Sequence, residues 1–484
     1  MGNAENESHA PGERRAAANA AFLLGTNAGR ILFNAALFFV IARVLGAAEL
    51  GRYSFAVSYA ALFAVVVHLG LNDLIIRQVA VRRADGPRYF TLALIVKSVL
   101  GVVITAVTAL AVAASGKPAA VQEMVLAAAL TATLVTGLET IVVSFFYAHE
   151  RMAYVLTLSV VKSGLNAAVG IGAALAGWGA RGILWGFLGV ETVCAVLVFV
   201  WARHKLDLRF VAVRAAEFPR LLFQSLPFAL NGVFITIYQQ LHYSLLSFFV
   251  GDVATGVFTA AAKLITFLNF IPSALTQALY PYLSRLAAGA GPDPRPPMMR
   301  WARYLALISF PTGLYFLLRA PAVVNLVYGT GYGDAARILA VLGLTIPFTF
   351  ATYPFAVALN AIHRERANTA VVAGAAVINV AANLTLIPRL GALGAAYALL
   401  ATEASQSVAR LILVRRWMGP LGAAVTFLRV AAPLVPVALA LLFLPVRGPV
   451  YVEIPCVAAL YLAGAFATRA LRLDDVRNIL HRPA

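Results

Sequence analysis

The sequence predicts an all-α integral membrane protein with about fourteen transmembrane helices, and three observations support this fold class. The 484 residues are 61% hydrophobic and only 12% charged, with a mean hydropathy of +0.85. A water-soluble protein of this length would not need so much apolar sequence. Apolar stretches follow one another from Ala16 to Leu471, each about long enough to cross a hydrocarbon core. Basic residues concentrate in alternate loops, as they do in membrane proteins.

Two pieces of the chain repeat. Gly46–Tyr53 resembles Gly251–Phe258 in sequence, and Gly179–Glu191 resembles Gly391–Glu403. Both matches pair span n with span n+6, so the two copies have the same orientation, which predicts two six-helix lobes related by an axis along the membrane normal. The last two spans fall outside this repeat. We place the spans at 16–41, 53–76, 89–114, 121–147, 153–176, 181–201, 220–249, 254–280, 302–325, 337–361, 367–387, 391–414, 426–444 and 450–468.

The repeat gives the predicted organisation of the chain. It consists of a disordered cytoplasmic N-terminus (1–15), an N-lobe (16–201), a cytoplasmic linker (202–219), a C-lobe (220–416), two further spans (417–471) and a cytoplasmic tail (472–484).

The distribution of positive charge sets the orientation. The formal net charge is +18, and most loop Lys and Arg residues fall on the side that holds the N-terminus. Because cytoplasmic loops carry this excess, both termini are predicted to be cytoplasmic. The charges are spread over short loops without a recognition module, so nucleic acid is not an expected partner. Cys194 and Cys456 lie in apolar spans and show no metal-ligand spacing.

Four cations lie well inside predicted spans: Arg30, Lys162, Lys263 and Arg319. A cation at bilayer depth costs roughly 2.5–3.5 kcal/mol on insertion scales, so four of them predict a protected polar cavity for an anionic substrate. Arg319 is near enough to the surface to snorkel. Lys97 and Arg429, nearer the cytoplasmic ends, are interpreted as snorkelling anchors.

Polar stripes accompany two of these cations. Arg30 shares a helical face with Asn34, and Lys263 with Asn269, so both asparagines are candidate substrate ligands. The alternative for each Ser, Thr or Asn is an interhelical hydrogen bond. The full stripes are Asn19, Thr26, Arg30 and Asn34 in the first span, and Thr259, Lys263, Thr266, Asn269, Ser273 and Thr276 or Gln277 in the eighth.

Coupling or gating candidates are Asp73, Glu139 and His242. Glu139 suits either a proton carrier or, more simply, the partner of a buried lysine. His242 suits a pH sensor, a sugar contact or a hydrogen-bonded helix contact. Glu191 and Glu403, at equivalent repeat positions, predict an ion pair within each lobe. The chain shows no Walker A, HExxH or nucleophile-elbow motif, so we expect a transporter rather than an enzyme, with no cofactor and no metal.

Several motifs, in order along nearly the whole chain, resemble the Wzx-type polysaccharide flippases of the MOP/MATE-like exporter superfamily. The resemblance implies two six-helix lobes that form a V-shaped central cavity, and alternating access. One departure is His242, where relatives tend to carry Asp. The motifs are Ile41–Gly46, Gly51–Ser54, Gly70–Leu71, Tyr147–Met152, Gly251–Lys263, Pro281–Ser284, Tyr328–Gly329 with Tyr332 and Ala335, and Asn383–Ala396 leading to Glu403.

The resemblance also implies a function. Wzx-type proteins move polyprenyl-pyrophosphate-linked oligosaccharide from the inner to the outer leaflet of the bacterial inner membrane, alongside polysaccharide polymerases and glycosyltransferases. Arg30, Lys162 and Lys263 would meet the pyrophosphate. Two negative charges that leave a negative interior gain roughly 4.6 kcal/mol per 100 mV, so membrane potential alone is one candidate driving force, and coupling to protons or sodium is the other.

Alternatives stay open. A lipid II flippase shares the fold and a basic cavity, whereas a MATE-like cation-coupled antiporter of small molecules would favour acidic residues. A membrane polymerase would need a larger outer loop, and a membrane scaffold would not need buried cations.

Overall fold

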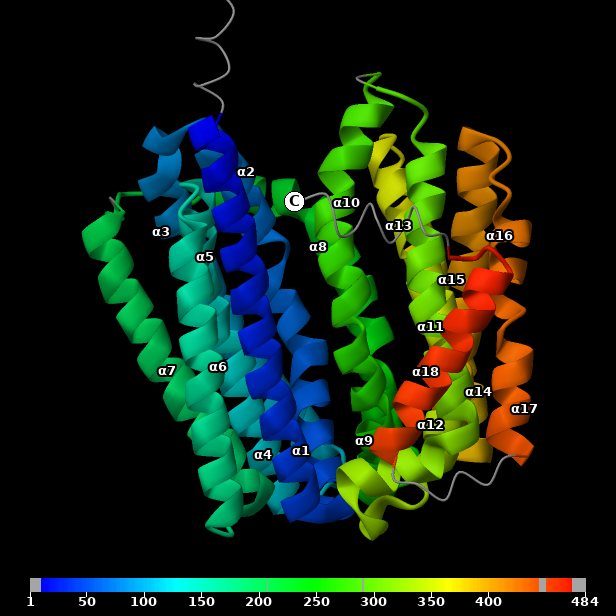
Figure 1. Ribbon diagram of the computed structural model, residues 1–484. Coiled ribbons are helices and arrows are strands. Elements are labelled where there is room, and N and C mark those ends of the chain that lie inside the picture. The colour runs from blue at the N-terminus through cyan, green and yellow to red at the C-terminus, as the bar shows by residue number, and fades with distance from the viewer. Residues whose placement is uncertain (1–9, 207, 290, 444–449, 472–484) are drawn as a thin grey trace, which may run out of the picture. The chain divides into compact units, whose positions relative to one another are not determined.

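The computed structural model describes residues 10–206, 208–289, 291–443 and 450–471 (Figure 1). Side chains are described for these residues except 10–28, 152, 227, 228, 231, 277 and 278. Helices make up nearly all of the described chain, as the composition predicts. The chain divides into two compact units, one reaching Ser244 and the other beginning at Leu245.

Unit 1 contains the helices up to the first part of α8. Its longest helix, α1, is broken at Gly46, whose φ of 73° is readily adopted only by glycine. The elements are α1 (Ala10–His68), α2 (Leu71–Val81), η1 (Arg83–Asp85), α3 (Gly86–Ala114), α4 (Ala119–Ala129), η2 (Leu130–Val135), α5 (Thr136–Ala148), α6 (Met152–Leu175), α7 (Gly179–Lys205) and α8 (Glu217–Phe249).

Unit 2 contains the remaining helices. A second long helix, α11, has a non-helical residue at Arg319 and carries Pro311 and Pro321. The elements are α9 (Asp252–Leu268), α10 (Phe270–Ala287), α11 (Arg295–Tyr328), η3 (Thr330–Tyr332), α12 (Ala335–Gly343), α13 (Thr345–Ala361), α14 (Glu365–Leu390), α15 (Ala392–Met418), α16 (Ala423–Ala431), α17 (Leu434–Phe443) and α18 (Val450–Ala467).

Eleven helical segments of the described chain are long and apolar enough to cross a membrane. One of them, Gly29–Val81, covers the first two predicted spans, which are two helices that meet at the non-helical residue Gly46. The predicted seventh and twelfth spans correspond to α8 and α15, which are not among the eleven. Each predicted span therefore has a helix. Helix α1 begins at Ala10, within the segment predicted to be disordered, and residues 1–9 and 472–484 lie outside the described chain.

The predicted linker 202–219 overlaps the connection between α7 and α8. In it, the Val211 N–H donates to the Thr91 hydroxyl at 3.1 Å, and the Arg88 guanidinium donates to Glu217 at 2.8 Å. That hydrogen bond holds the pKa of Glu217 below its usual range. The linker is thus tied to α3, although both partners of the ion pair are close to water.

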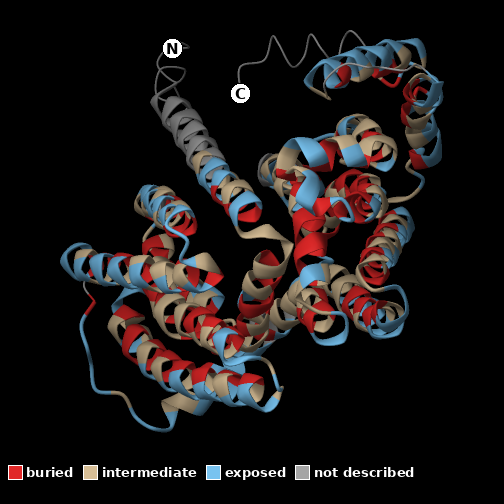
Figure 2. Cartoon of the chain, turned by 90° about the horizontal axis from the view of Figure 1, so that it is seen from below, coloured by how far each residue is buried: buried red, intermediate tan, exposed pale blue. Residues whose placement is uncertain are grey.

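Each unit has its own apolar core, and the helices turn their buried residues toward their neighbours (Figure 2). In unit 1, Phe90 packs edge-on against Phe145 with ring centroids 5.7 Å apart. In unit 2, Phe355 belongs to a cluster shared by α10, α11, α13 and α15. Helices α16, α17 and α18 pack against α11, so the last two spans are attached to unit 2 through that helix (Figure 1).

Candidate functional site

Arg30 and Asn34 are exposed on α1. Phe33 of the same helix lies against Gly164 of α6. Arg30 and Asn34 are one helical turn apart, as the sequence predicts, and together present a cation and an amide. The side chains of Asn19 and Thr26, which complete the predicted stripe, lie outside the described residues.

Lys162 is the centre of a buried ionic cluster in unit 1. Its ammonium lies 3.0 Å from Glu139 Oε2 and 2.9 Å from Glu191 Oε2, and thereby joins α6 to α5 and α7. Asn166, one turn along α6, donates to Glu191 Oε1 at 2.9 Å. The predicted pairing of Glu139 with a buried lysine and the predicted ion pair of Glu191 within its lobe are confirmed. One cation faces two carboxylates, so the positive charge of Lys162 is already balanced before any anion arrives.

Lys97 is not a snorkelling anchor, and that interpretation was wrong. Its side chain is fully buried, and its ammonium donates to Asn72 Oδ1 at 2.8 Å, the Gly137 carbonyl at 3.1 Å and Thr140 Oγ1 at 3.0 Å. The place of Lys97 along its helix already indicated burial. Lys97 lies eleven residues after Gly86, the first residue of α3, which is about 16 Å along a helix at 1.5 Å per residue.

Lys263 is half-buried on α9 in unit 2. The hydroxyls of its stripe bond within their own helix: Thr259 donates to the Thr255 carbonyl at 2.7 Å, and Thr266 to the Ala262 carbonyl at 2.9 Å. Asn269 stands at the break between α9 and α10, and its Oδ1 is buried without a hydrogen-bond partner among the described residues. A buried acceptor of this kind is costly unless a ligand or water supplies a donor.

Arg319 forms an ion pair that the sequence analysis missed. Its Nε lies 2.7 Å from Glu453 Oε1 on α18, and the Tyr315 hydroxyl donates to the same carboxylate at 3.4 Å. Glu453 is buried, at 4% exposure, in a span that looked plain in composition. An acidic residue inside an apolar helix demands a partner in the same way as a cation, and that signal could have identified the pair.

The predicted coupling residues separate in the structure. Glu139 belongs to the cluster around Lys162. His242 is buried on α8 with its ring centroid 4.2 Å from that of Tyr243, whereas Asp73 is exposed in the first turn of α2. No group of three or more His, Cys, Asp or Glu side chains suited to a metal ion occurs among the described residues.

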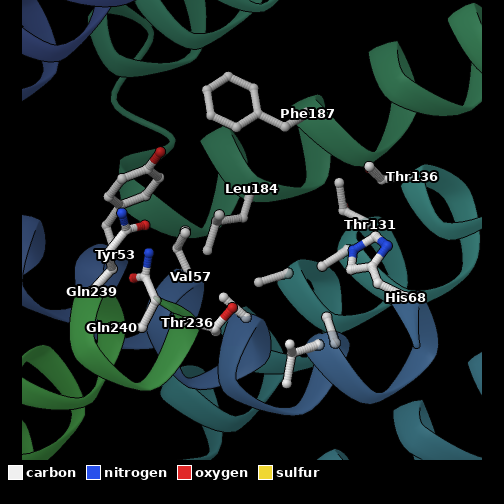
Figure 3. A pocket seen from close by; sticks show the side chains of 15 residues that line it. Tyr53, Val57, His68, Thr131, Thr136, Leu184, Phe187, Thr236, Gln239 and Gln240 are labelled. Carbon is white, nitrogen blue, oxygen red and sulfur yellow. The ribbon is translucent and has the colours of Figure 1, made fainter. Parts of the chain in front are cut away.

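A cavity of about 370 Å³ lies inside unit 1, lined by α1, α4, η2, α5, α7 and α8 (Figure 3). Element η2 is a π-helix, and in it the Thr136 N–H donates to the Thr131 carbonyl, five residues back. A bond over five residues brings these two threonines onto one face, and both line the cavity. Tyr53, His68, Thr236, Gln239 and Gln240 supply the other polar walls.

Comparisons with known proteins agree with this architecture. Residues 16–287 match the model of a family described as "Polysaccharide biosynthesis protein". The fold is similar to the lipid II flippase MurJ in an inward closed conformation, with a TM-score of 0.75 and 12% identity over 95% of this chain and 100% of that one.

Two other solved transporters of the MOP superfamily share the fold. An inward-facing multidrug resistance MATE transporter matches with a TM-score of 0.64 and 17% identity, over 83% of this chain and 98% of that one. A transporter from Pyrococcus furiosus, described as having a binding pocket of reverse polarity, matches with a TM-score of 0.56 and 16% identity, over 83% of this chain and 95% of that one. A comparison with proteins of curated function found no match.

Proposed function

Because the chain belongs to the polysaccharide biosynthesis protein family, we propose that it is a flippase for polyprenyl-pyrophosphate-linked oligosaccharide. The substrate would cross from the inner to the outer leaflet by alternating access. The observation that carries the proposal is this family membership, and it is supported by the cations inside predicted spans of a chain with the fold of MOP-superfamily transporters.

The proposed contacts to pyrophosphate are Arg30 and Lys263, with Asn34 and Asn269 as neighbouring hydrogen-bond donors. A pyrophosphate diester carries about two negative charges, and charge-assisted hydrogen bonds from Arg and Lys are the strong way to hold it. Lys162 and Arg319 contribute less directly, because carboxylates already balance them. Their roles are to hold helices together.

The test uses a strain that depends on this chain for surface polysaccharide. The variants Arg30→Ala and Lys263→Ala should each abolish transport, seen as accumulation of lipid-linked oligosaccharide in the cytoplasmic leaflet, while the protein stays in the membrane. Arg30→Lys should keep part of the activity, because the charge remains but the bidentate fork is lost.

Matched controls are Arg429→Ala on α16 and Lys205→Ala at the end of α7, both exposed. Lys97 is unsuitable as a control because it is buried. Normal transport by an Arg30→Ala, Lys263→Ala double variant would refute the anionic-substrate proposal. Transport of lipid II in place of the oligosaccharide, in a parallel assay, would move the chain to the peptidoglycan branch.

The proposed location is the bacterial inner membrane, with both termini cytoplasmic and with glycosyltransferases and a polymerase acting before and after transport. The excess of positive charge in alternate loops supports this orientation. Reporter fusions within 208–216 and after Gly291 should be active on the cytoplasmic side, and fusions at Lys117 on the outside. The reverse pattern would overturn the proposed orientation.

A further inference from the structure

The cavity inside unit 1 is polar yet carries no full charge. Its hydrogen-bonding walls are Tyr53, His68, Thr136, Thr236, Gln239 and Gln240, and no Asp, Glu, Lys or Arg is among the described residues that line it. In Figure 3 the two glutamines and Tyr53 stand together at one end of the cavity, and His68 stands at the other. The ligand that this lining suits is neutral and rich in hydroxyl groups.

Several of these polar groups are available. Among the described residues, the side chains of Tyr53, Gln239 and Gln240 make no hydrogen bond within the protein. Each glutamine amide offers two donors and an acceptor, and a phenol offers one donor and an acceptor. Gln239 is exposed, and Tyr53 and Gln240 are partly buried, so all three side chains are open to a ligand. Alternating donors and acceptors are what a sugar's hydroxyls pair with.

The remaining walls fit the same ligand. Phe187, Val57 and Leu184 supply apolar surface in the same cavity, suited to the C–H face of a pyranose ring (Figure 3). The volume of about 370 Å³ is at the small end of ligand sites, enough for one or two sugar rings. A pyrophosphate would enter without a cation to balance it, at a desolvation cost that a neutral ring avoids.

A local distortion also belongs to this cavity. The π-helix at Leu130–Val135 is what turns both Thr131 and Thr136 to the cavity wall. Such π-segments are rare and frequently occur at functional sites. The helix thus departs from α geometry where the cavity needs two hydroxyls.

We propose that this cavity binds a neutral sugar residue of the lipid-linked oligosaccharide, and that Tyr53, Gln239 and Gln240 are its main hydrogen-bonding residues. The proposal rests on the proposed function and assigns the two parts of the substrate to different binding residues. Cations at Arg30 and Lys263 hold the pyrophosphate, and the neutral cavity of unit 1 holds sugar.

The test measures the binding of two lipids to the purified full-length protein in nanodiscs. One probe is undecaprenyl pyrophosphate, and the other is the same lipid carrying a single N-acetylglucosamine. Wild-type protein should bind the sugar-bearing lipid more tightly. Gln239→Leu, Gln240→Leu and Tyr53→Phe should each raise its Kd about fivefold, the effect of losing roughly one neutral hydrogen bond, and leave the Kd of the sugar-free lipid within twofold.

The matched control is Gln224→Leu, which changes an exposed glutamine on the same helix outside the cavity and should change neither Kd. Equal wild-type affinity for the two lipids, or cavity variants that weaken both lipids alike, would overturn the sugar proposal and leave the flippase proposal standing. Binding of neither lipid by wild-type protein would overturn both. Arg30→Ala should show the opposite pattern, weakening both lipids.

Discussion

The buried glutamates of the two units occupy equivalent repeat positions but differ in their partners. In unit 1, Glu191 on α7 meets the Lys162 ammonium at 2.9 Å. In unit 2, Glu403 on α15 accepts a hydrogen bond from the Thr349 hydroxyl at 2.9 Å. The two repeats are offset by 212 to 213 residues. At this offset, the residue of unit 2 equivalent to Lys162 is Gly374 or Ala375. Unit 2 therefore has no lysine at the position from which unit 1 reaches its glutamate.

The comparison shows that the two units share the position of the buried glutamate but not its charged partner. In both units the carboxylate ties a helix pair, and an asparagine on the preceding helix assists: Asn166 bonds Glu191, and Asn379 bonds Thr402, next to Glu403. The charged partners differ: Lys162 lies on the helix before Glu191, whereas the cation that interacts electrostatically with Glu403 is Arg410 on its own helix. A buried ionic cluster contributes little net stability when intact but is costly to break, because it leaves buried charge behind. Unit 1 should therefore be the more sensitive of the two to single substitutions.

The largest expected effect comes from Lys162→Met. Removal of the ammonium leaves Glu139 and Glu191 facing each other in the interior, which should cost about 3–5 kcal/mol of stability. We expect little folded protein in the membrane, measured by size-exclusion chromatography and thermal unfolding in detergent. The triple variant Lys162→Met, Glu139→Gln, Glu191→Gln should recover most of the folded protein. No recovery would mean that packing around Lys162 matters more than its charge.

An intermediate effect is expected for Glu191→Gln. Lys162 keeps Glu139 as a partner, so the loss is that of one charge-assisted hydrogen bond, about 1.5–3 kcal/mol. The equivalent variant Glu403→Gln should cost less, since the Thr349 hydroxyl can donate to an amide oxygen as well. Thermal unfolding of both variants in one detergent gives the comparison. A larger loss in Glu403→Gln would reverse the ranking of the two units.

The smallest effect is expected for Thr349→Val. The substitution preserves shape and removes one hydrogen bond to Glu403, at a cost of about 1 kcal/mol. Thr312→Val is the control, because this exposed hydroxyl bonds only its own helix, at the Ile308 carbonyl. Indistinguishable unfolding temperatures for the two variants would show that Thr349 does not support the glutamate.

Much of the fold was predictable from the sequence, because hydropathy and length report membrane spans directly. The all-α class is confirmed, the predicted family is confirmed by the match over 16–287, and each predicted span coincides with a helix. The break between the first two spans was predictable too, because Gly46 adopts a φ of 73°, which favours glycine and interrupts the helix between the two predicted spans.

The candidate site was predictable only in part. Charge inside a span identified Lys162 and Glu139 as partners, since each needs the other. Lys97 was misread because distance from a span end was judged from uncertain boundaries, and Glu453 was missed because it opens its helix. The neutral cavity left only a partial sequence signal, the adjacent Gln239 and Gln240 in the seventh predicted span. Its Tyr, Thr and Gln residues come from spans far apart in the chain, and each is unremarkable alone.

The π-helix at Leu130–Val135 also decides which side chains of the fourth predicted span share one face of the helix. An α-helix advances by 100° per residue, so an insertion or deletion of one residue within a regular α-helix rotates the side chains beyond it by about 100° relative to those before it. The π-helix absorbs one extra residue in its wider turn, so deletion of a single residue from 130–135 should restore regular α form, keep the facing of α4 relative to α5, and remove one hydroxyl from the cavity wall.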